Sequence, residues 1–205
     1  PCTCSRQTIA NALAQQGINT PRNQEMIYPG TCRPEKLTSY TTDELNSNKA
    51  AWRIALPQHC EITFEDLALG TQHQNLNQQV GDFVLKRSDG LFTYQLAVVV
   101  DDALQGITHI VRGEDLLSNT GRQIHLQDVL GLPTPHYRHL PLVLDEHGEK
   151  LSKQTLATQI QTQSDEQALA ELRKAAIHLG LRDLPDGDDI TIAEWLHAAT
   201  QAWGK

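Results

Sequence analysis

The stretch HIVRGEDLLSNTGRQ, residues 109–123, decides which fold this sequence predicts. Apolar and polar side chains alternate over residues 107–113, which predicts a β-strand that ends near Arg112. Two carboxylates follow, and Asn119 then has the residue type of a helix N-cap. In an open α/β sheet, ligands bind at the carboxyl ends of strands, so Arg112 is well placed to bind a ligand carboxylate.

A structural role for Arg112 is an equally strong alternative at this point. Glu114 and Asp115 follow it closely, and an ion pair with either carboxylate would occupy the guanidinium. Tyr94 lies eighteen residues before Arg112, beside the apolar run at 96–100. A tyrosine in such a place more often belongs to the core or its rim than to a substrate site.

The rest of the chain predicts a mixed α/β fold. Strands are expected at 52–56, 60–65, 82–88 and 137–145. Helices are expected at 6–16, near 34–47, from Asn119 to Gly131, at 165–180 and from about Thr191, whereas residues 70–79 are expected to form a loop. Asp89 and Gly90 predict a hairpin-like turn. The apolar run at 96–100 fits a buried strand or a buried helix, and periodicity does not distinguish the two.

Two lysines stand in the segment GEKLSKQ, residues 148–154, after a turn-like DEHG. Taken alone, Lys150 and Lys153 are more often solvated surface charges than ligands. The alternative is a pair of cations directed at a phosphate. The surrounding sequence has to decide between these two interpretations.

Three thiols gather near the start of the sequence, at Cys2, Cys4 and Cys32. Zinc binds such sets through four tetrahedral ligands. Candidates for the fourth ligand are His59, Cys60 and Tyr28. The spacing alone supports zinc and a set of unrelated cysteines about equally. Elsewhere the histidines show no recognisable ligand spacing and are interpreted as surface or satisfied core residues: His109, His125, His136 and His139.

The composition limits the functional classes. The 205 residues are 39% hydrophobic and carry a net charge of −8, which argues against general coating of nucleic acid but allows a local basic groove. The apolar run at 96–100 is too short to span a bilayer and no signal-peptide pattern begins the sequence, so no membrane partner is expected. The four cysteines do not resemble a disulfide framework, which favours a reducing, cytoplasmic setting.

The residues from FTYQLAVVVDD through GITHIVRGEDL and NTGRQ to the lysine segment resemble the glutamyl branch of class I aminoacyl-tRNA synthetases, over about residues 80–155. KLSKQ, residues 150–154, is similar to that family's KMSKS motif, with Leu for Met and Gln for the last Ser. The resemblance implies an α/β fold, the second half of a class I Rossmann-type catalytic domain. The implied domains are a zinc-binding insert at 1–50, the half catalytic domain at 51–147, and the lysine-motif loop with a short helical, stem-contact-like tail at 148–205.

Two features resemble a truncated paralogue within this branch, the glutamyl-queuosine tRNA(Asp) synthetases. Only 51 residues follow Gln154, whereas full glutamyl-tRNA synthetases carry a long helical anticodon-binding region there. The segments CTC and YPGTC are similar to the paralogue's zinc insert, which implies one structural Zn²⁺. The implied ligands are Cys2, Cys4, Tyr28 and Cys32, although the stretch between Cys4 and Tyr28 is longer than usual for the family.

The resemblance implies a two-step reaction. L-Glutamate attacks the α-phosphate of ATP, with Mg²⁺, to give glutamyl-adenylate and pyrophosphate. The glutamyl group then moves to queuosine in the anticodon of tRNA(Asp). By matching positions, Lys150 and Lys153 are the expected catalytic cations, and Lys153 is also the expected ATP-binding residue. Tyr94 and Arg112 are the expected L-glutamate ligands.

The family's N-terminal half holds a HIGH-type motif, which has no counterpart in this sequence. The chain is therefore expected to be the C-terminal part of a longer protein, inactive on its own and monomeric. Two alternatives are a fragment of an ordinary glutamyl-tRNA synthetase, which generally needs tRNA before it activates glutamate, and a catalytically silent tRNA-binding module. The paralogue does not need tRNA for that step. Expected tRNA contacts are Arg122, Arg138, Arg173 and Lys174.

Overall fold

The computed structural model describes residues 1–19, 26–36, 39–47, 49–145, 147–151, 160–187 and 189–203. The chain divides into two compact units. The first comprises residues 1–112 and 116–139, and the second comprises residues 113–115 and 140–205. Within the described residues, no helix combines the length and the apolar character that a membrane crossing requires.

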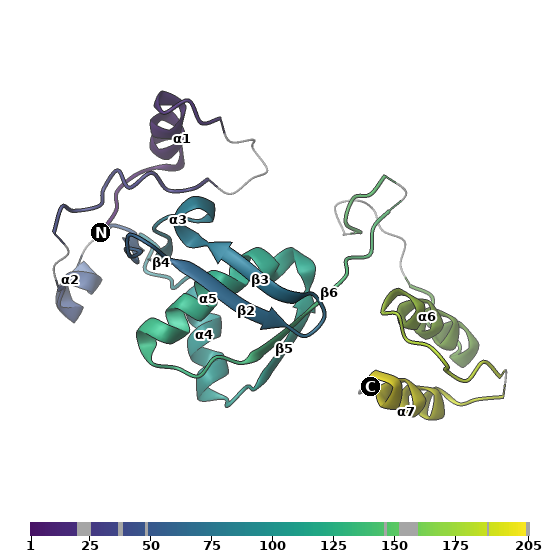
Figure 1. The fold of residues 1–205 in the computed structure, drawn as a ribbon. Helices are drawn as coiled ribbons and strands as arrows, with labels where there is room; N and C mark the ends of the chain where they lie inside the picture. The colour runs from purple at the N-terminus through teal and green to yellow at the C-terminus, as the bar shows by residue number, and fades with distance from the viewer. Residues whose placement is uncertain are drawn as a thin grey trace. The chain divides into compact units, whose positions relative to one another are not determined.

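A four-stranded sheet organises the first unit, with the strand order β3-β2-β6-β5 (Figure 1). Its strands are β2 (Glu61–Asp66), β3 (Gly70–Asn75), β5 (His109–Gly113) and β6 (His136–Leu140). β2 and β3 pair antiparallel along their whole length, from Glu61 opposite Asn75 to Asp66 opposite Gly70. β2 joins β6 in parallel, with Asp66 opposite Tyr137. The carboxyl end of β2 therefore lies directly beside β6.

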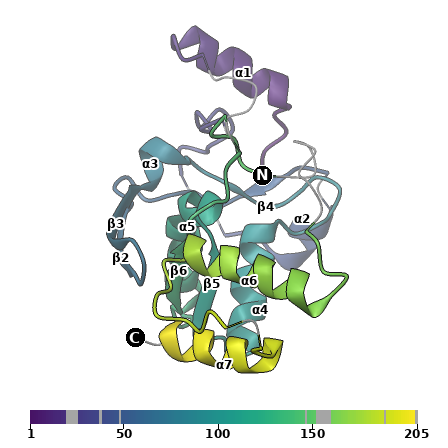
Figure 2. The same ribbon diagram turned by 90° about the vertical axis from the view of Figure 1, so that its right-hand side faces the viewer.

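Two helices accompany this sheet, α4 (Tyr94–Leu104) and α5 (Leu117–Leu130). α5 packs against both α4 and β2. Both helices lie behind the β2–β3 hairpin in Figure 1, and in Figure 2 the same hairpin projects to one side of them. The buried side chains of the main core come from α4, α5, the helical turn at 76–79 and the segments on either side of that turn: Leu56, Cys60, Leu76, Val80, Phe83, Val99 and Leu126.

The apolar run at 96–100, which fits either element by periodicity, lies inside α4. Thr93 has the extended backbone of an N-cap residue. Its hydroxyl donates to the Val84 carbonyl at 2.9 Å and so ties the start of the helix to the preceding strand. A strand buried on both faces would hide the whole run, whereas here Ala97 is exposed and Val99 is buried. The run is therefore one side of an amphipathic helix.

The expectation that residues 70–79 form a loop is wrong, because they form β3 and the short helix α3 (Leu76–Gln79). The polar strand is stabilised by contacts from α5. Gln74 is only 9% exposed; its Oε1 accepts the Gly121 N–H, and its Nε2 donates to the Leu117 carbonyl. These partners are distant in sequence, so no local pattern in 70–79 reveals them.

The predicted N-cap of α5 is also wrong. The helix begins two residues before Asn119, at Leu117, and Asn119 Oδ1 instead accepts a hydrogen bond from Gln95 Nε2 at 2.7 Å. Its predicted end is confirmed, since Gly131 has the left-handed conformation with φ of 65°. The side chain at position 119 thus links α5 to α4.

Two predicted elements are shorter in the structure. The strand expected at 52–56 is reduced to β1 (Trp52–Arg53), which pairs antiparallel with β4 (Val84–Lys86). The helix expected near 34–47 is the short α2 (Thr42–Ser47). Both differences shorten an element that the residue pattern alone extends too far.

A partly buried ion pair joins the N-terminal segment to the rest of the first unit. It contains α1 (Arg6–Gln15), which Ser5 caps as the sequence predicts. Arg33 Nη1 lies 2.8 Å from Asp82 Oδ1, and Arg33 Nη2 donates to the Leu56 carbonyl. The Leu56 N–H donates to the same Asp82 oxygen at 2.9 Å. Asp82 therefore joins this segment to the main core.

The second unit contains the two helices that the C-terminal sequence predicts, α6 (Asp165–His178) and α7 (Ile192–Trp203). Ser164 caps α6 by accepting the Gln167 N–H. Thr191 and Glu194 form a reciprocal capping box at the start of α7. The apolar faces of the two helices bury Leu169, Ala176 and Trp195.

Gly81 should tolerate no side chain. Its φ is +70°, and a Cβ atom there would lie 2.8 Å from the Tyr28 carbonyl oxygen. Gly90 has a comparable φ of +89° with nothing within 4 Å of the Cβ position, so it is the matched control. We expect Gly81→Ala to lower the free energy of unfolding by about 2 kcal/mol more than Gly90→Ala, measured by chemical denaturation of the full-length protein. Equal losses would contradict the close approach of the Tyr28 backbone.

Candidate functional site

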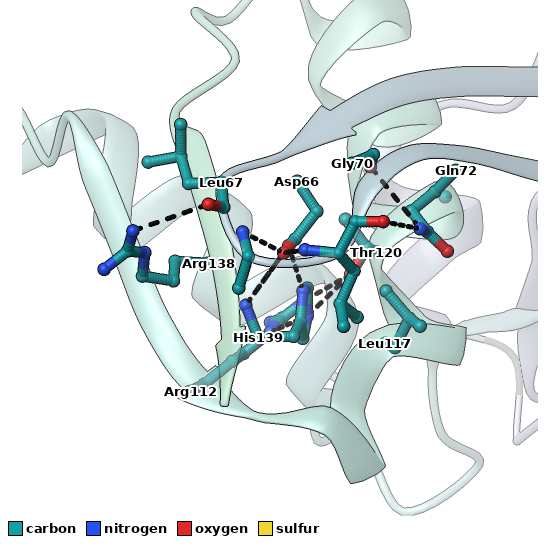
Figure 3. Close-up of polar contacts among 12 residues, drawn as sticks. Asp66, Leu67, Gly70, Gln72, Arg112, Leu117, Thr120, Arg138 and His139 are labelled. Carbon is teal, nitrogen blue, oxygen red and sulfur yellow. Dashed lines mark hydrogen bonds and ion pairs between the residues drawn. The ribbon is translucent and has the colours of Figure 1, made fainter. Parts of the chain in front are cut away.

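Arg112, at the end of β5, is held by three acceptors in a polar network. Figure 3 shows two of them, His139 and Thr120. Its Nε donates to His139 Nε2 at 3.1 Å. Its Nη2 donates to Thr120 Oγ1 and its Nη1 to Gln123 Oε1, each at 2.8 Å. β6 supplies His139, and α5 supplies the other two acceptors. Two adjacent elements therefore fix the guanidinium through a ring nitrogen, a hydroxyl and an amide, without a carboxylate.

Asp66 extends the network behind His139, and both side chains are 0% exposed. His139 Nδ1 lies 2.6 Å from Asp66 Oδ2. Asp66 Oδ1 accepts the backbone N–H groups of Ala68 and Leu69, at 3.0 Å each. Burial alone would raise the pKa of Asp66, but the hydrogen bonds from His139 and these two amides outweigh it and hold that pKa below its ordinary value. The carboxylate form is therefore the one that the site stabilises.

The contact with Arg112 defines the tautomer of His139. A guanidinium can only donate, so Nε2 has to be the acceptor and the ring proton lies on Nδ1, where it faces Asp66. The Thr120 hydroxyl lies 3.1 Å from the same Nε2. The direction of donation thus runs from Arg112 to the imidazole and from the imidazole to the buried carboxylate.

An internal ion pair with Glu114 or Asp115 would be the structural alternative for Arg112, and this alternative is wrong for the described residues. None of their carboxylates lies within ion-pair distance of Arg112, and Asp115 instead pairs with Lys150 at 2.5 Å. A Cβ at Gly113 would lie 2.5 Å from Asp115 Oδ1, so the Arg-Gly-Glu-Asp turn needs glycine there to let the Asp115 carboxylate fold back.

Tyr94 lies near this network but not in contact with Arg112. It begins α4, is 52% exposed, and lines a pocket of about 410 Å³. The next residue, Gln95, accepts a hydrogen bond from Gln123 Nε2 at 2.9 Å and so connects the pocket to the Arg112 network. Among the described residues, no hydrogen bond joins Tyr94 to Arg112.

Arg112 and Tyr94 both affect the buried side chain of Tyr137 electrostatically. Arg112 Cζ is 5.2 Å from its ring centroid, and its hydroxyl accepts a hydrogen bond from Gln127. Burial raises the pKa of Tyr137; the Gln127 bond and the Arg112 charge oppose that shift, and Tyr94 adds to it. Tyr94 and Arg112 are thus both within electrostatic range of one buried ring.

Of the two lysines of the motif, the structure describes only Lys150. Lys150 lies in a short hairpin in which it is opposite Leu144. Its Nζ pairs with Asp115 Oδ2, and both side chains are partly exposed, at 51% and 38%. Lys153 lies outside the described residues. The structure therefore places Lys150 at the start of the motif beside the Asp115 carboxylate.

The three N-terminal thiols lie together. The Sγ atoms of Cys2, Cys4 and Cys32 are all within 4.8 Å of one another. The Tyr28 hydroxyl joins them, 3.5 Å from Cys2 Sγ, and accepts the Cys32 N–H at 2.6 Å. Cys60, an alternative fourth ligand by spacing, lies instead in the main core with Sγ 3.7 Å from His125 Nδ1. The structure thus brings Tyr28, and not Cys60, to the thiol cluster.

The chemistry of this cluster fits zinc. Four ligands at about 2.3 Å in a tetrahedron place their donor atoms about 3.8 Å apart, a spacing that suits the cluster. Cys4 Sγ and Cys32 Sγ are only 3.2 Å apart. Their mutual hydrogen bond raises the pKa of Cys4 to about 11 and lowers that of Cys32 to about 7, while burial raises the pKa of Tyr28. Donors this close, competing for protons, are suited to share a cation.

Two other sequence expectations are decided by burial. His139 is the satisfied core histidine that the lack of a ligand spacing predicts. The expected tRNA contact at Arg122 is wrong, because that side chain is only 4% exposed and stacks near the Phe83 ring. Lys174 is exposed and pairs with Glu171 within its own helix.

Sequence reasoning missed the acceptors around Arg112. Asp66 ends a strand of alternating residues and looks like an ordinary polar turn residue. Thr120 and Gln123 lie in the stretch that carries the family resemblance, where their spacing on one helical face was the available signal. Nothing near His139 in the sequence indicates a carboxylate partner 73 residues away.

Comparisons with known proteins identify the family of the chain. Residues 2–184 match the family described as tRNA synthetases class I (E and Q), catalytic domain. The whole chain is 49% identical to a protein of Burkholderia cenocepacia (strain HI2424) named Glutamyl-Q tRNA(Asp) synthetase, and covers 65% of that protein. A protein of the same name from Albidiferax ferrireducens is 48% identical over 99% of the chain, which covers 68% of it. The chain thus spans about two thirds of the length of these curated relatives.

A solved structure supports the same assignment. The fold matches the crystal structure of a glutamate tRNA ligase from Elizabethkingia meningosepticum in complex with its amino acid, with a TM-score of 0.56 and 26% identity. The match covers 75% of this chain and 31% of that one. The family match, the relatives and the fold agree. The chain belongs to the family of class I tRNA synthetase catalytic domains for glutamate and glutamine, and its curated relatives are named glutamyl-Q tRNA(Asp) synthetases.

Proposed function

We propose that the full-length protein activates L-glutamate with ATP and transfers the glutamyl group to queuosine in the anticodon of tRNA(Asp). The names of relatives up to 49% identical support this substrate pair. The observation that carries the proposal is the set of groups that contact the Arg112 guanidinium. Three hydrogen bonds hold its guanidinium, and no carboxylate among the described residues pairs with it, so its positive charge is available to a substrate carboxylate.

The chemistry needs no covalent bond to the protein. In the first step a carboxylate oxygen of glutamate attacks the α-phosphorus of ATP, and the bond to pyrophosphate breaks. In the second step a hydroxyl of the queuosine cyclopentene ring attacks the carbonyl carbon of glutamyl-adenylate, and AMP leaves. Both steps depend on positioning and on stabilising negative charge, with Mg²⁺ expected on the phosphates.

We assign Arg112 and Tyr94 to L-glutamate. Arg112 supplies the charge, and the Tyr94 hydroxyl supplies a donor at the rim of the pocket beside it. The charged residues in the lining of that pocket are three arginines, Arg6, Arg53 and Arg122, and one carboxylate, Asp82, so positive charges outnumber negative ones. Their combined potential favours an anionic ligand over a neutral one.

We assign Lys153 to the phosphates of ATP and Lys150 to the departing pyrophosphate. Lysine suits this task because its compact charge can follow a moving phosphate. In the present structure Lys150 is paired with Asp115. Lys150 therefore has to exchange this carboxylate for a phosphate when ATP binds, and the exposure of the pair keeps that exchange inexpensive in free energy.

We further propose that Cys2, Cys4, Tyr28 and Cys32 hold one zinc ion with a structural role. Four protein ligands leave no open position for a substrate water. When bound, the metal would connect the start of the chain to the segment around Tyr28. Since that segment bridges to Gly81, the ion would stiffen one wall of the pocket at Tyr94.

An ordinary glutamyl-tRNA synthetase is the second candidate, favoured by the fold match to a glutamate tRNA ligase. The two candidates share the first step and differ in the nucleic acid that takes part. They differ also in when that nucleic acid is needed, because ordinary enzymes of this branch generally require tRNA for glutamate activation.

The proposed function predicts glutamate-dependent exchange between ATP and radiolabelled pyrophosphate without tRNA. The assay uses the full-length protein, with omission of glutamate as the control. Exchange without tRNA, followed by glutamylation of queuosine-containing tRNA(Asp), is the expected result. Exchange only in the presence of tRNA(Glu) would favour the ordinary synthetase, and no exchange under either condition would favour a catalytically silent tRNA-binding module.

Replacing Arg112 should affect glutamate and not ATP. Lysine keeps the charge but loses the planar fork that three acceptors hold, so we expect Arg112→Lys to raise the KM for glutamate by about tenfold or more. The KM for ATP should stay within about twofold, because Arg112 is assigned no contact with the nucleotide. The control is Arg87→Ala, an exposed arginine paired with Asp89 in a turn. An unchanged glutamate KM in Arg112→Lys would exclude Arg112 from the glutamate site.

Loss of one zinc ligand should remove the metal. We expect the purified wild-type protein to contain about one zinc per chain, measured by plasma mass spectrometry, and Cys4→Ser to contain much less and to melt at a lower temperature. Cys60→Ser is the matched control, since Cys60 is a free thiol buried outside the cluster. A wild-type protein without zinc, or equal loss in both variants, would contradict the assignment.

A further inference from the structure

Asp66 and His139 take no part in the proposed chemistry, yet both side chains are completely buried. Burying a carboxylate is costly unless hydrogen bonds satisfy it. Asp66 meets this condition in full: one oxygen accepts two backbone N–H groups, and the other accepts the imidazole. The His139 backbone N–H also reaches the carboxylate, at 3.2 Å from Oδ2. Such a site places both side chains in one arrangement only.

The two oxygens of Asp66 accept hydrogen bonds from different groups. Oδ1 faces the amides of Ala68 and Leu69 and can only accept there, whereas Oδ2 receives the Nδ1 proton of His139. This leaves the lone pair of Nε2 directed at the Nε–H of Arg112. A carboxylate is thus the group that makes the buried imidazole an acceptor toward the guanidinium.

The consequence for Arg112 concerns its remaining donors. A guanidinium has five N–H bonds. His139, Thr120 and Gln123 use one each at Nε, Nη2 and Nη1. Within the described part of the chain this leaves one N–H on each Nη nitrogen, and these two donors are available to a ligand carboxylate.

The charge of Arg112 also favours binding of a ligand carboxylate. A carboxylate in direct contact with Arg112 would orient it equally well but would neutralise it. Here no hydrogen-bond partner of Arg112 is an anion: Asp66 is one imidazole away, and Asp102 acts on the guanidinium only through longer-range electrostatics. The guanidinium is therefore oriented by neutral groups and keeps its charge for the ligand. The separation of Arg112 from Asp66 therefore prevents the two charges from pairing directly.

We propose that Asp66 and His139 are positioning residues for the substrate carboxylate, acting through Arg112. This inference rests on the proposed function, in which Arg112 binds L-glutamate. A purely structural role is the competing account, because Asp66 also joins β2 to β6. The two accounts differ in whether a change at Asp66 acts on glutamate selectively.

Asp66→Asn tests the difference without changing volume. The asparagine oxygen has to stay with the two backbone N–H groups, so its NH₂ group faces His139 and drives the ring proton to Nε2. That tautomer cannot accept from Arg112. In the full-length protein we expect ¹⁵N NMR to show His139 protonated at Nε2, and exchange assays to show a glutamate KM raised by about tenfold or more, with the KM for ATP within about twofold.

Gln127→Met is the matched control, because it removes a buried hydrogen bond to β6 without touching Arg112. A change in both KM values in Asp66→Asn, in proportion to its loss of melting temperature and shared by Gln127→Met, would overturn the proposal. So would an unchanged glutamate KM. If wild type shows no glutamate-dependent exchange, or Arg112→Lys leaves the glutamate KM unchanged, the proposed function itself fails and takes this inference with it.

A second pair of variants covers the case in which Asp66→Asn does not fold. His139→Gln offers an amide oxygen to Arg112 and an NH₂ group to Asp66, whereas His139→Phe keeps the ring and loses both contacts. We expect the glutamate KM of the Gln variant to stay within about threefold of wild type and that of the Phe variant to rise by about tenfold or more. Equal effects of the two variants on the glutamate KM would overturn the proposal.

Discussion

The buried contact between Asp66 and His139 is the interaction on which the rest of the site depends. It lies where β2 and β6 pair in parallel, a pairing for which Asp66 and Tyr137 form the register. It also sets the direction of the hydrogen bond between Arg112 and His139, because the carboxylate holds the imidazole proton on the side away from the guanidinium. The same buried carboxylate thus lies at the pairing of two strands and orients, through His139, the side chain that we assign to the ligand.

The Arg-Gly-Glu-Asp segment shows how neighbouring charges receive different environments. Arg112 donates three hydrogen bonds to neutral groups and keeps its charge, whereas Asp115, three residues later, is paired with Lys150. Gly113 permits this separation, since a side chain there would collide with the Asp115 carboxylate. The segment contributes residues to both compact units of the chain. One short turn therefore supplies both the cation that we assign to the substrate and a partner for a motif lysine.

Local pattern predicted the elements whose signals are local. The alternation at 107–113, the Ser5 cap of α1 and the amphipathic helix at 165–180 all have counterparts in the structure. The polar strand β3 and the start of α5 were mispredicted, because Gln74 and Asn119 find their partners on other elements. The resemblance to a known family, and not the cysteine spacing, indicated Tyr28 as the fourth member of the thiol cluster. The acceptors of Arg112 were missed because their identity depends on tertiary contacts.

The most direct measurement is a crystal structure of the full-length protein with L-glutamate. Our account predicts that a glutamate carboxylate occupies the two remaining Nη donors of Arg112, and that the contacts from Arg112 to His139, Thr120 and Gln123 stay as they are without ligand. Glutamate bound away from Arg112, or an Arg112 side chain that leaves His139 to reach the ligand, would contradict the claim that the buried pair prepares this cation for its substrate.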